Sequence, residues 1–278
     1  MAFDFNIMRS LIYVDVVKEE YRVKLLHWLY AHHVPESISQ FSPYVTKYAF
    51  YNALPSPDKE GRFGTVRMQL TEHYWLVDEN LPEMSCRTIK EYFPTDVLKW
   101  QGNIPENAAE GNPTGDEARR SKGNGTTAHP FVFAFVPLCW ESDLKGKGRT
   151  IEDGPNYRWQ FLISYPEGIS KECGDKWFFE EVVPYFQKDT RVNRLLSSAV
   201  KQDINDCRYV RAVEIWFDGP EEWEEVVEKG ASVIKKPDWA QTPDFPYLLP
   251  YQNITGIFLA DYVTSDNLTQ YHGYQTLR

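Results

Sequence analysis

The sequence predicts an α+β fold made of two halves in one chain, each with the element order β-α-β-β-α-β. Three observations support this prediction. The 278 residues suffice for one large core or for two smaller ones. Two segments of the first half have counterparts in the second half, in the same order. Apolar periodicity and turn residues give both halves the same succession of strands and helices.

The first recurring segment is the end of a helix. Residues 25–35 read LLHWLYAHHVP and residues 173–184 read CGDKWFFEEVVP, with the same spacing from tryptophan to proline. Aligning the two tryptophans gives the pairs Trp28–Trp177, His27–Lys176 and Tyr30–Phe179. The second segment lacks the histidines of the first, so only the first half could use imidazoles at this place.

The second recurring segment is a strand. Residues 72–80 read EHYWLVDEN and residues 213–221 read VEIWFDGPE. Their alignment gives the pairs Trp75–Trp216 and His73–Glu214. Two matches in the same order, each in the same kind of predicted element, favour the tandem duplication of an ancestral unit.

The elements of the first half follow from apolar runs and their boundaries. The predicted elements are a strand at 8–17, a helix at 18–32, strands at 44–54 and 65–77, a helix near 84–100 and a strand at 131–138. Residues 101–130 are rich in Gly, Asn, Pro and charged residues. Such a composition predicts a long flexible loop before the last strand.

The second half gives the same order more clearly. The predicted elements are a strand at 156–166, a helix at about 170–183, strands within 191–200 and 207–218, a helix at 220–234 and a closing strand at 254–263. Ser170 is a suitable N-cap for the first helix. Pro220 and the acidic residues after it suit the first turn of the second helix.

This element order is that of the ferredoxin-like split βαβ arrangement. We therefore expect a first ferredoxin-like half at 1–140, a linker at 141–156 and a second half at 157–278. The strand at 211–217 is apolar on both sides, which indicates that both faces of its sheet are buried. Helices cover only one face of such a sheet, so the sheets of the two halves are expected to pack against each other.

With this element order and the helix end WLYAHHVP, the chain resembles the dimeric α/β-barrel superfamily and, within it, the EthD-like proteins. The resemblance covers most of the chain apart from about residues 101–156. It implies that the two halves form within one chain the arrangement that two subunits form elsewhere. The superfamily includes cyclases, decarboxylases, cofactor-independent oxygenases and haem enzymes, so the resemblance implies a fold more than a reaction.

Composition narrows the class of partner. The net charge is −10 and the pI is near 5.2, and no cluster of Lys and Arg stands out, which argues against nucleic acid and anionic membranes as partners. Aromatic residues make up 15% of the chain and could line a pocket for a small apolar or aromatic substrate. The four cysteines are widely spaced, which favours free buried thiols and a cytoplasmic location. No signal peptide or membrane span is expected. The chain is expected to be a monomer or a homodimer.

Three residues are the predicted catalytic groups: His27, His73 and Tyr30. His27 lies at the margin of the apolar face of the first helix, with Tyr30 near it on the same side. His73 shares a face of the strand at 65–77 with Trp75, because side chains two apart point the same way. If that face looks toward the helix, the three groups could converge on one aromatic-lined cavity.

An imidazole near its ordinary pKa can transfer protons at neutral pH, and a tyrosine hydroxyl can orient an oxygen of the substrate. The predicted substrate-binding residues are Trp28, His33, Tyr74, Trp75, Glu214 and Trp216. We therefore expect a cofactor-independent enzyme of lyase, dehydratase, decarboxylase or cyclase type, which acts on an apolar and aromatic or polyketide-like molecule.

Other roles for the same residues stay open at this point. A histidine near a helix end often only caps the helix, and His32 and His33 fit that role. The chain could be a non-catalytic binding protein for the same ligand, or a haem protein with one histidine ligand. No metal site is expected, because there is no HExxH motif, no paired cysteine ligands and no His-x-x-x-His on one helical face.

Overall fold

A computed structural model describes residues 8–16, 19–35, 38, 45–75, 131–149, 153–201, 207–248, 254–259 and 265–266. The first half contributes strands β1 (Met8–Val16), β2 (Val45–Asn52), β3 (Gln69–Trp75) and β4 (Phe131–Lys145). The second half contributes β5 (Tyr157–Ile163), β6 (Arg194–Val200), β7 (Arg211–Phe217) and β8 (Ile254–Leu259), and the short β9 (Ser265–Asp266) adds to β2. The helix predicted near 84–100 and the loop predicted at 101–130 lie outside the described residues.

The two halves have the same strand order. The sheet runs β8-β5-β7-β6-β4-β1-β3-β2-β9, so each half follows the order fourth, first, third, second strand. Every neighbouring pair of these strands is antiparallel. This is the order of the ferredoxin-like arrangement, and the α+β prediction is therefore confirmed.

The sheets of the two halves are joined edge to edge rather than packed face to face. At one junction β4 pairs with β6, from Cys139 opposite Val200 to Lys145 opposite Leu195. At the other, Ala53 just after β2 forms a bridge to Leu259 at the end of β8. A backbone hydrogen bond of 2.8 Å from Leu54 N to Phe258 O supports this second junction.

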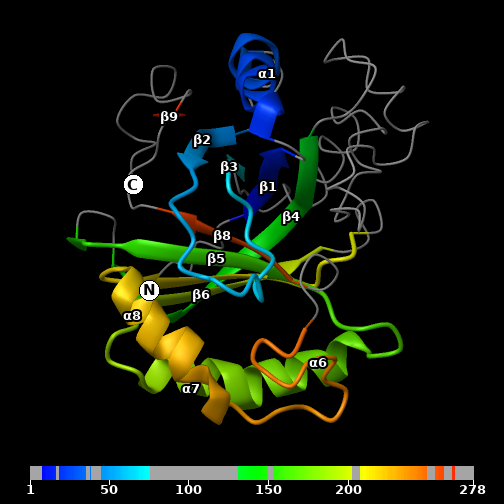
Figure 1. Cartoon of the computed structure of the whole chain (residues 1–278), viewed down its shortest axis with the longest axis vertical. Helices are drawn as coiled ribbons and strands as arrows, with labels where there is room; N and C mark the ends of the chain where they lie inside the picture. The colour runs from blue at the N-terminus through cyan, green and yellow to red at the C-terminus, as the bar shows by residue number, and fades with distance from the viewer. Residues whose placement is uncertain are drawn as a thin grey trace, which may run out of the picture.

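The sheet thereby closes on itself, and strands β1 to β8 form a barrel of the dimeric α/β-barrel type within one chain (Figure 1). The expected barrel-type arrangement of the two halves within one chain is confirmed, and the two sheets form it by joining at their edges. A closed barrel buries the second face of both sheets as effectively as face-to-face packing would, and it leaves fewer free edges.

The described helices lie on two opposite sides of the barrel. They are α1 (Arg22–Trp28), α6 (Lys171–Trp177), α7 (Val183–Lys188) and α8 (Pro220–Trp223). Short π-helical and 3-10 segments extend them, at Glu19–Tyr21, Leu29–His33, Phe178–Val182, Glu224–Lys229 and Ala231–Val233. Figure 1 shows α1 beside the strands of the first half and α6 to α8 beside those of the second.

The first pair of similar segments has the same structure in both halves. The α-helical part ends at Trp28 in α1 and at Trp177 in α6, and five π-helical residues follow in each case. Ser170 caps α6, as predicted, because its Oγ accepts a hydrogen bond of 3.2 Å from the backbone N of Cys173. The order of strands and this helix end are what the two halves share.

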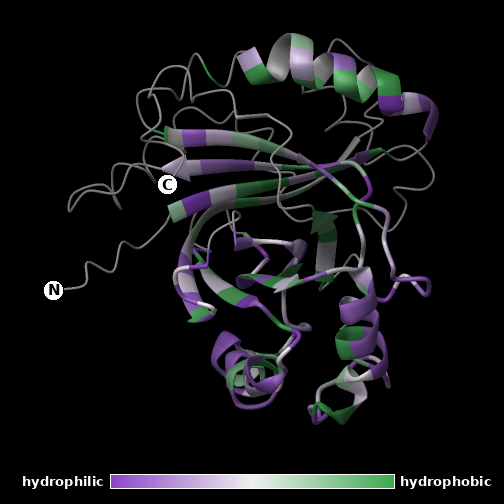
Figure 2. Ribbon diagram, turned by 90° about the vertical axis from the view of Figure 1, so that its left-hand side faces the viewer, coloured by the Kyte–Doolittle hydropathy of each residue, from purple (hydrophilic) through white to green (hydrophobic). Residues whose placement is uncertain are grey.

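The described residues form three apolar clusters. One lies between the second half's strands and α6 to α8, and includes Trp159, Phe186 and Trp223. A smaller one lies between the first half's strands and α1, and includes Leu25, Leu29, Tyr48 and Trp75. The third combines inward-facing residues of both halves, among them Leu11, Tyr13, Leu70, Leu162, Tyr209 and Ile257. The strands accordingly carry alternating polar and apolar bands (Figure 2).

One boundary and the burial of one cysteine differ from the predictions. Strand β4 continues to Lys145, so its last residues fall in the range 141–156 that was expected to be a linker. Among the described cysteines, Cys139, Cys173 and Cys207 are free, as predicted, but Cys173 is exposed rather than buried.

Candidate functional site

His73 lies in the apolar layer between the first half's strands and α1. It is 1% exposed, and its ring stacks on that of Tyr48 at a centroid distance of 4.4 Å. The centroid of the Trp75 ring is 6.2 Å from that of His73 in an edge-to-face arrangement, and Trp75 Nε1 donates a hydrogen bond of 2.8 Å to Ser10 Oγ. The face of β3 that carries His73 and Trp75 therefore does look toward the helix, which places the imidazole in an aromatic cluster.

Tyr30 reaches the same face of the sheet. Its hydroxyl accepts a hydrogen bond of 2.9 Å from Gln69 Nε2, and the same nitrogen donates to Asn52 Oδ1 at 2.9 Å. The Tyr30 ring is 5.9 Å from that of Phe50. Because Gln69 and His73 lie on the same side of β3, Tyr30 and His73 belong to one face of the first half.

His27 does not join them. Its side chain is exposed, whereas Leu25 and Leu29 of the same helical stretch are buried. With 3.6 residues per turn, His27 lies about 200° around the helix axis from Leu25. The prediction that His27 shares a cavity with His73 was therefore wrong. The side chains of Trp28 and His33, two predicted substrate-binding residues, lie outside the described part.

The alignment of His73 with Glu214 was also wrong, by one residue. Glu72 lies opposite Leu11 of β1, and Glu214 lies opposite Gln160 at the corresponding place of β5. Glu72 is thus the counterpart of Glu214, and Tyr74 is the counterpart of Trp216. A shift of one residue changes the face of a strand, so His73 faces α1 while Glu214 faces the barrel interior.

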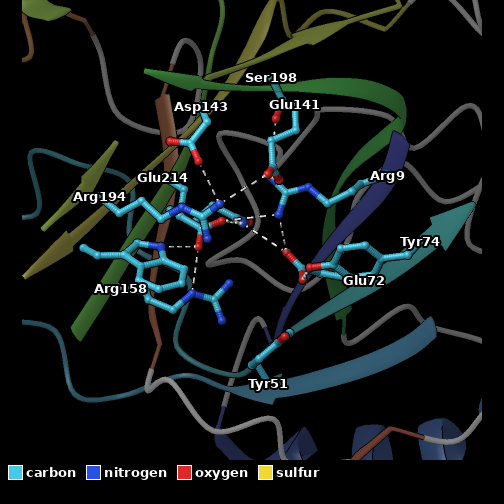
Figure 3. A network of polar contacts seen from close by, with 12 residues as sticks. Arg9, Tyr51, Glu72, Tyr74, Glu141, Asp143, Arg158, Arg194, Ser198 and Glu214 are labelled. Carbon is cyan, nitrogen blue, oxygen red and sulfur yellow. Dashed lines mark hydrogen bonds and ion pairs between the residues drawn. The ribbon is translucent and has the colours of Figure 1, made fainter. Parts of the chain in front are cut away.

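The barrel interior contains a network of buried charges centred on Arg9 (Figure 3). Arg9 Nη1 lies 3.2 Å from Glu72 Oε1 and 3.3 Å from Glu214 Oε2. Its Nη2 lies 3.4 Å from Glu141 Oε2 and 3.3 Å from Ser198 Oγ. Arg9 belongs to the first half, so the network connects it to strands of the second.

Gln160 holds the two central carboxylates together. Its Nε2 donates to Glu72 Oε1 at 3.1 Å and to Glu214 Oε2 at 2.8 Å, while its Oε1 accepts from the Tyr13 hydroxyl at 2.5 Å. Arg158 Nε donates to Glu214 Oε1 at 2.7 Å. Every one of these side chains is buried, so the loss of a partner would leave an unsatisfied polar group at a cost in stability.

The predicted residues Tyr74, Glu214 and Trp216 are part of this network. The Tyr74 hydroxyl donates to Glu72 Oε2 at 2.7 Å, and Trp216 Nε1 donates to Glu214 Oε1 at 2.6 Å. They lie on the other side of the sheet from His73. The predicted site therefore divides into an outer group around His73 and an inner group around Arg9.

The inner charges shift each other's protonation. Burial raises the pKa of Glu214, but the charges of Arg158 and Arg9 outweigh it, so the pKa lies well below the usual glutamate range. Burial also raises the pKa of Glu141, which Arg9 only partly compensates. Burial lowers the pKa of Arg9, but Glu141 and Glu72 more than reverse this effect.

Towards the end of the barrel the network becomes less buried. Arg194 Nη2 lies 3.1 Å from Asp143 Oδ2, and both side chains are about one-sixth exposed. Lys47, on β2, is half-buried, and its Nζ lies 5.2 Å from the centroid of the Tyr74 ring. Lys47 and Arg194 are counterparts, because they lie opposite Tyr74 and Trp216 respectively.

Sequence reasoning missed Arg9, Glu72, Arg158 and Gln160. Arg158 and Gln160 alternate with apolar residues along their strand, in the order Arg158-Trp159-Gln160-Phe161. Such alternation is typical of a strand with one face in water. Only the closure of the barrel buries that face. The strand at 211–217 indicated that both faces of its sheet are buried, but not that these polar residues face inward.

Two kinds of site find no support in the described part of the chain. No group of three or more His, Cys, Asp or Glu residues there could hold a metal ion. No helix there is long and apolar enough to cross a membrane. The cytoplasmic location stays a prediction.

The family model for the chalcone isomerase N-terminal domain matches residues 5–106, which is less than half of the chain. The matched range includes α1 and β1 to β3, and so includes His73 and Tyr30. It is not the EthD-like family that the sequence resembled, and that resemblance and the tandem duplication stay predictions. No curated protein matches the chain.

Solved structures resemble the chain only distantly. An anthrone oxidase-like protein is 9% identical, with 96% of this chain and 94% of that chain covered and a TM-score of 0.44. A mutant chlorite dismutase from Candidatus Nitrospira defluvii in complex with cyanide is 5% identical, with coverages of 93% and 91% and a TM-score of 0.43. At such scores these likenesses say nothing about the activity of this chain.

Proposed function

We propose that the chain is a cofactor-independent enzyme that uses general acid–base catalysis to cyclise or isomerise an aromatic small molecule. His73 is the group that transfers the proton, and Tyr30, held by Gln69, orients an oxygen of the substrate. The observation that carries this proposal is the buried imidazole of His73 within a cluster of aromatic rings, on the sheet face that also binds the Tyr30 hydroxyl.

The surroundings of His73 suit an aromatic substrate. The rings of Tyr48 and Trp75 surround the imidazole with aromatic groups, a lining that suits an aryl group. At 1% exposure the imidazole has little contact with bulk water, so a proton that it releases goes to a bound molecule rather than to solvent.

The match to the chalcone isomerase N-terminal domain supports an isomerase of this kind. A chalcone has two aryl rings joined by an unsaturated ketone. Ring closure of a hydroxychalcone forms one C–O bond from a phenol oxygen and moves one proton to carbon. The reaction needs no oxidant or reductant, so a correctly placed acid–base group is sufficient.

The test uses 2′-hydroxychalcone as the probe and follows the loss of its enone absorbance. We expect His73→Gln to lower kcat/KM by about 10²–10⁴-fold, as loss of a general acid or base does. Binding of the probe, measured by calorimetry, should change little. His27→Gln is the matched control, because the same substitution there affects an exposed side chain.

Two results would overturn the proposal. Binding of hydroxychalcones without conversion by the wild-type protein would instead indicate a non-catalytic binding protein. Equal activity of His73→Gln and the wild type would remove His73 from the chemistry. A haem protein is the third possibility, and it would show visible absorption after addition of haemin. A protein preparation that stays colourless and does not bind added haemin excludes it.

A further inference from the structure

We propose a second binding site, inside the barrel, for the carboxylate of a small aromatic acid. It consists of Arg158, Lys47 and the rings of Tyr51 and Trp216, which we call the Arg158 site. It is independent of the proposed function, because it lies on the opposite side of the sheet from His73.

The first observation concerns the guanidinium of Arg158. The side chain is 3% exposed, and its Nε is bonded to Glu214 Oε1. Within the described residues its two terminal nitrogens have no hydrogen-bond acceptor, and Figure 3 shows them directed away from Glu214. The guanidinium is largely removed from water, so an acceptor for its two terminal nitrogens would be favourable, and this end of Arg158 suits a ligand that accepts two hydrogen bonds.

The second observation concerns Lys47, which comes from the other half. Its Nζ lies 3.5 Å from the Tyr51 hydroxyl, and no described carboxylate forms an ion pair with it. Its counterpart Arg194, in contrast, is paired with Asp143. The pairing is therefore asymmetric, and the positive charge of Lys47 is available to an anion.

Both cations, Arg158 and Lys47, lie near the ring of Tyr51. Arg158 Cζ lies 4.7 Å from the centroid of the Tyr51 ring, and Lys47 Nζ lies 6.0 Å from it. Arg158 Cζ also lies 5.6 Å from the Trp216 ring. These contacts hold the guanidinium plane in place and surround it with aromatic surface.

The chemistry of the site favours a planar monoanion attached to a ring. A carboxylate matches the fork of a guanidinium with two parallel hydrogen bonds. An aryl group would contact the rings of Tyr51 and Trp216. A dianion such as phosphate is disfavoured, because the charge of Glu214 lies next to Arg158.

The test compares three probes by isothermal titration calorimetry with the full chain. Benzoate carries both the charge and the ring, benzamide lacks the charge, and acetate lacks the ring. We expect benzoate to bind at least about tenfold more tightly than either, since charge-assisted hydrogen bonds and aromatic contacts each contribute on that scale.

Two substitutions locate the binding. Arg158→Lys keeps a positive charge beside Glu214 but removes the fork, and Lys47→Gln removes a charge from a half-buried position. Each should weaken benzoate binding about tenfold. Lys59→Gln is the matched control, because Lys59 is 78% exposed and paired with Glu224. His73→Gln should bind benzoate like the wild type, which separates this proposal from the proposed function.

Benzoate binding no tighter than that of benzamide or acetate would overturn the proposal. So would wild-type affinity for benzoate in both Arg158→Lys and Lys47→Gln.

Discussion

Glu214 is a buried carboxylate that stays ionised because its neighbours compensate its charge. Arg158 Nε, Gln160 Nε2 and Trp216 Nε1 all donate hydrogen bonds to it, at 2.6 to 2.8 Å. Without these donors and the charge of Arg9, burial would favour its protonated form. The ionised state of Glu214 therefore depends on these donors and charges, and the buried charges of Arg9 and Arg158 depend in turn on Glu214.

Replacing Glu214 tests this dependence. Glu214→Gln leaves Arg9 and Arg158 buried without one of their carboxylates, so we expect it to lower the free energy of unfolding by about 3–5 kcal/mol. Chemical denaturation measures the change. Glu225→Gln, in the exposed pair with Lys229, is the control and should have little effect. Equal effects of the two substitutions would contradict the compensated network.

The pH dependence of stability follows from the lowered pKa of Glu214. The unfolded chain binds more protons than the folded one in acid, so the stabilisation is present above the ordinary glutamate pKa of about 4.3. It is lost progressively as the pH falls from there toward the lower pKa of the folded state. We expect Glu214→Gln to flatten the acid limb of a plot of unfolding free energy against pH. A limb as steep as that of the wild type would contradict this assignment.

At the scale of elements, helix α6 packs closely on Tyr165, two residues after the end of β5. A Cβ added to Gly174 would lie 2.3 Å from the ring of Tyr165. The Tyr165 hydroxyl also donates to Asp175 Oδ1 at 2.9 Å, which fixes the ring beneath the helix. The absence of a side chain at Gly174 therefore sets the distance between α6 and the sheet.

Gly174→Ala should consequently destabilise the protein, although alanine favours helices. Overpacking typically costs about 1–3 kcal/mol. Cys173→Ala, an exposed position of the same helix, should stay within about 0.5 kcal/mol of the wild type. Thermal or chemical denaturation of both variants measures the changes in stability. Stabilisation by Gly174→Ala would show that the contact with Tyr165 does not exclude a side chain at this position.

The sequence predicted the succession of elements better than their register. The helix end at Trp28 and its counterpart at Trp177 were found because both are followed by the same proline spacing and the same helical segments. The alignment of His73 with Glu214 failed because the aligned tryptophans, Trp75 and Trp216, lie on opposite faces of their strands. Identity of residue type cannot reveal a shift of one position, whereas the hydrogen-bonded partners of each strand do.

At the scale of the whole molecule, closure of the barrel could not be predicted from local patterns. Polar residues such as Arg158 and Gln160 alternate with apolar ones, which indicates a solvated face when a strand is considered alone. The two junctions, β4 with β6 and the bridge from Ala53 to Leu259, turn that face inward. The outer group around His73 was partly predicted, since it depends only on the helix that covers β3.

The central claim is that the two halves form one barrel with a shared charged interior, and the most direct test is the coupling between Arg9 and Glu214. They belong to different halves, and their side chains approach to 3.3 Å. A double-mutant cycle with Arg9→Met and Glu214→Gln measures the coupling free energy by denaturation. We expect it to lie between about 0.5 and 3 kcal/mol, as for residues in contact. Additive effects of the two substitutions would contradict a shared interior.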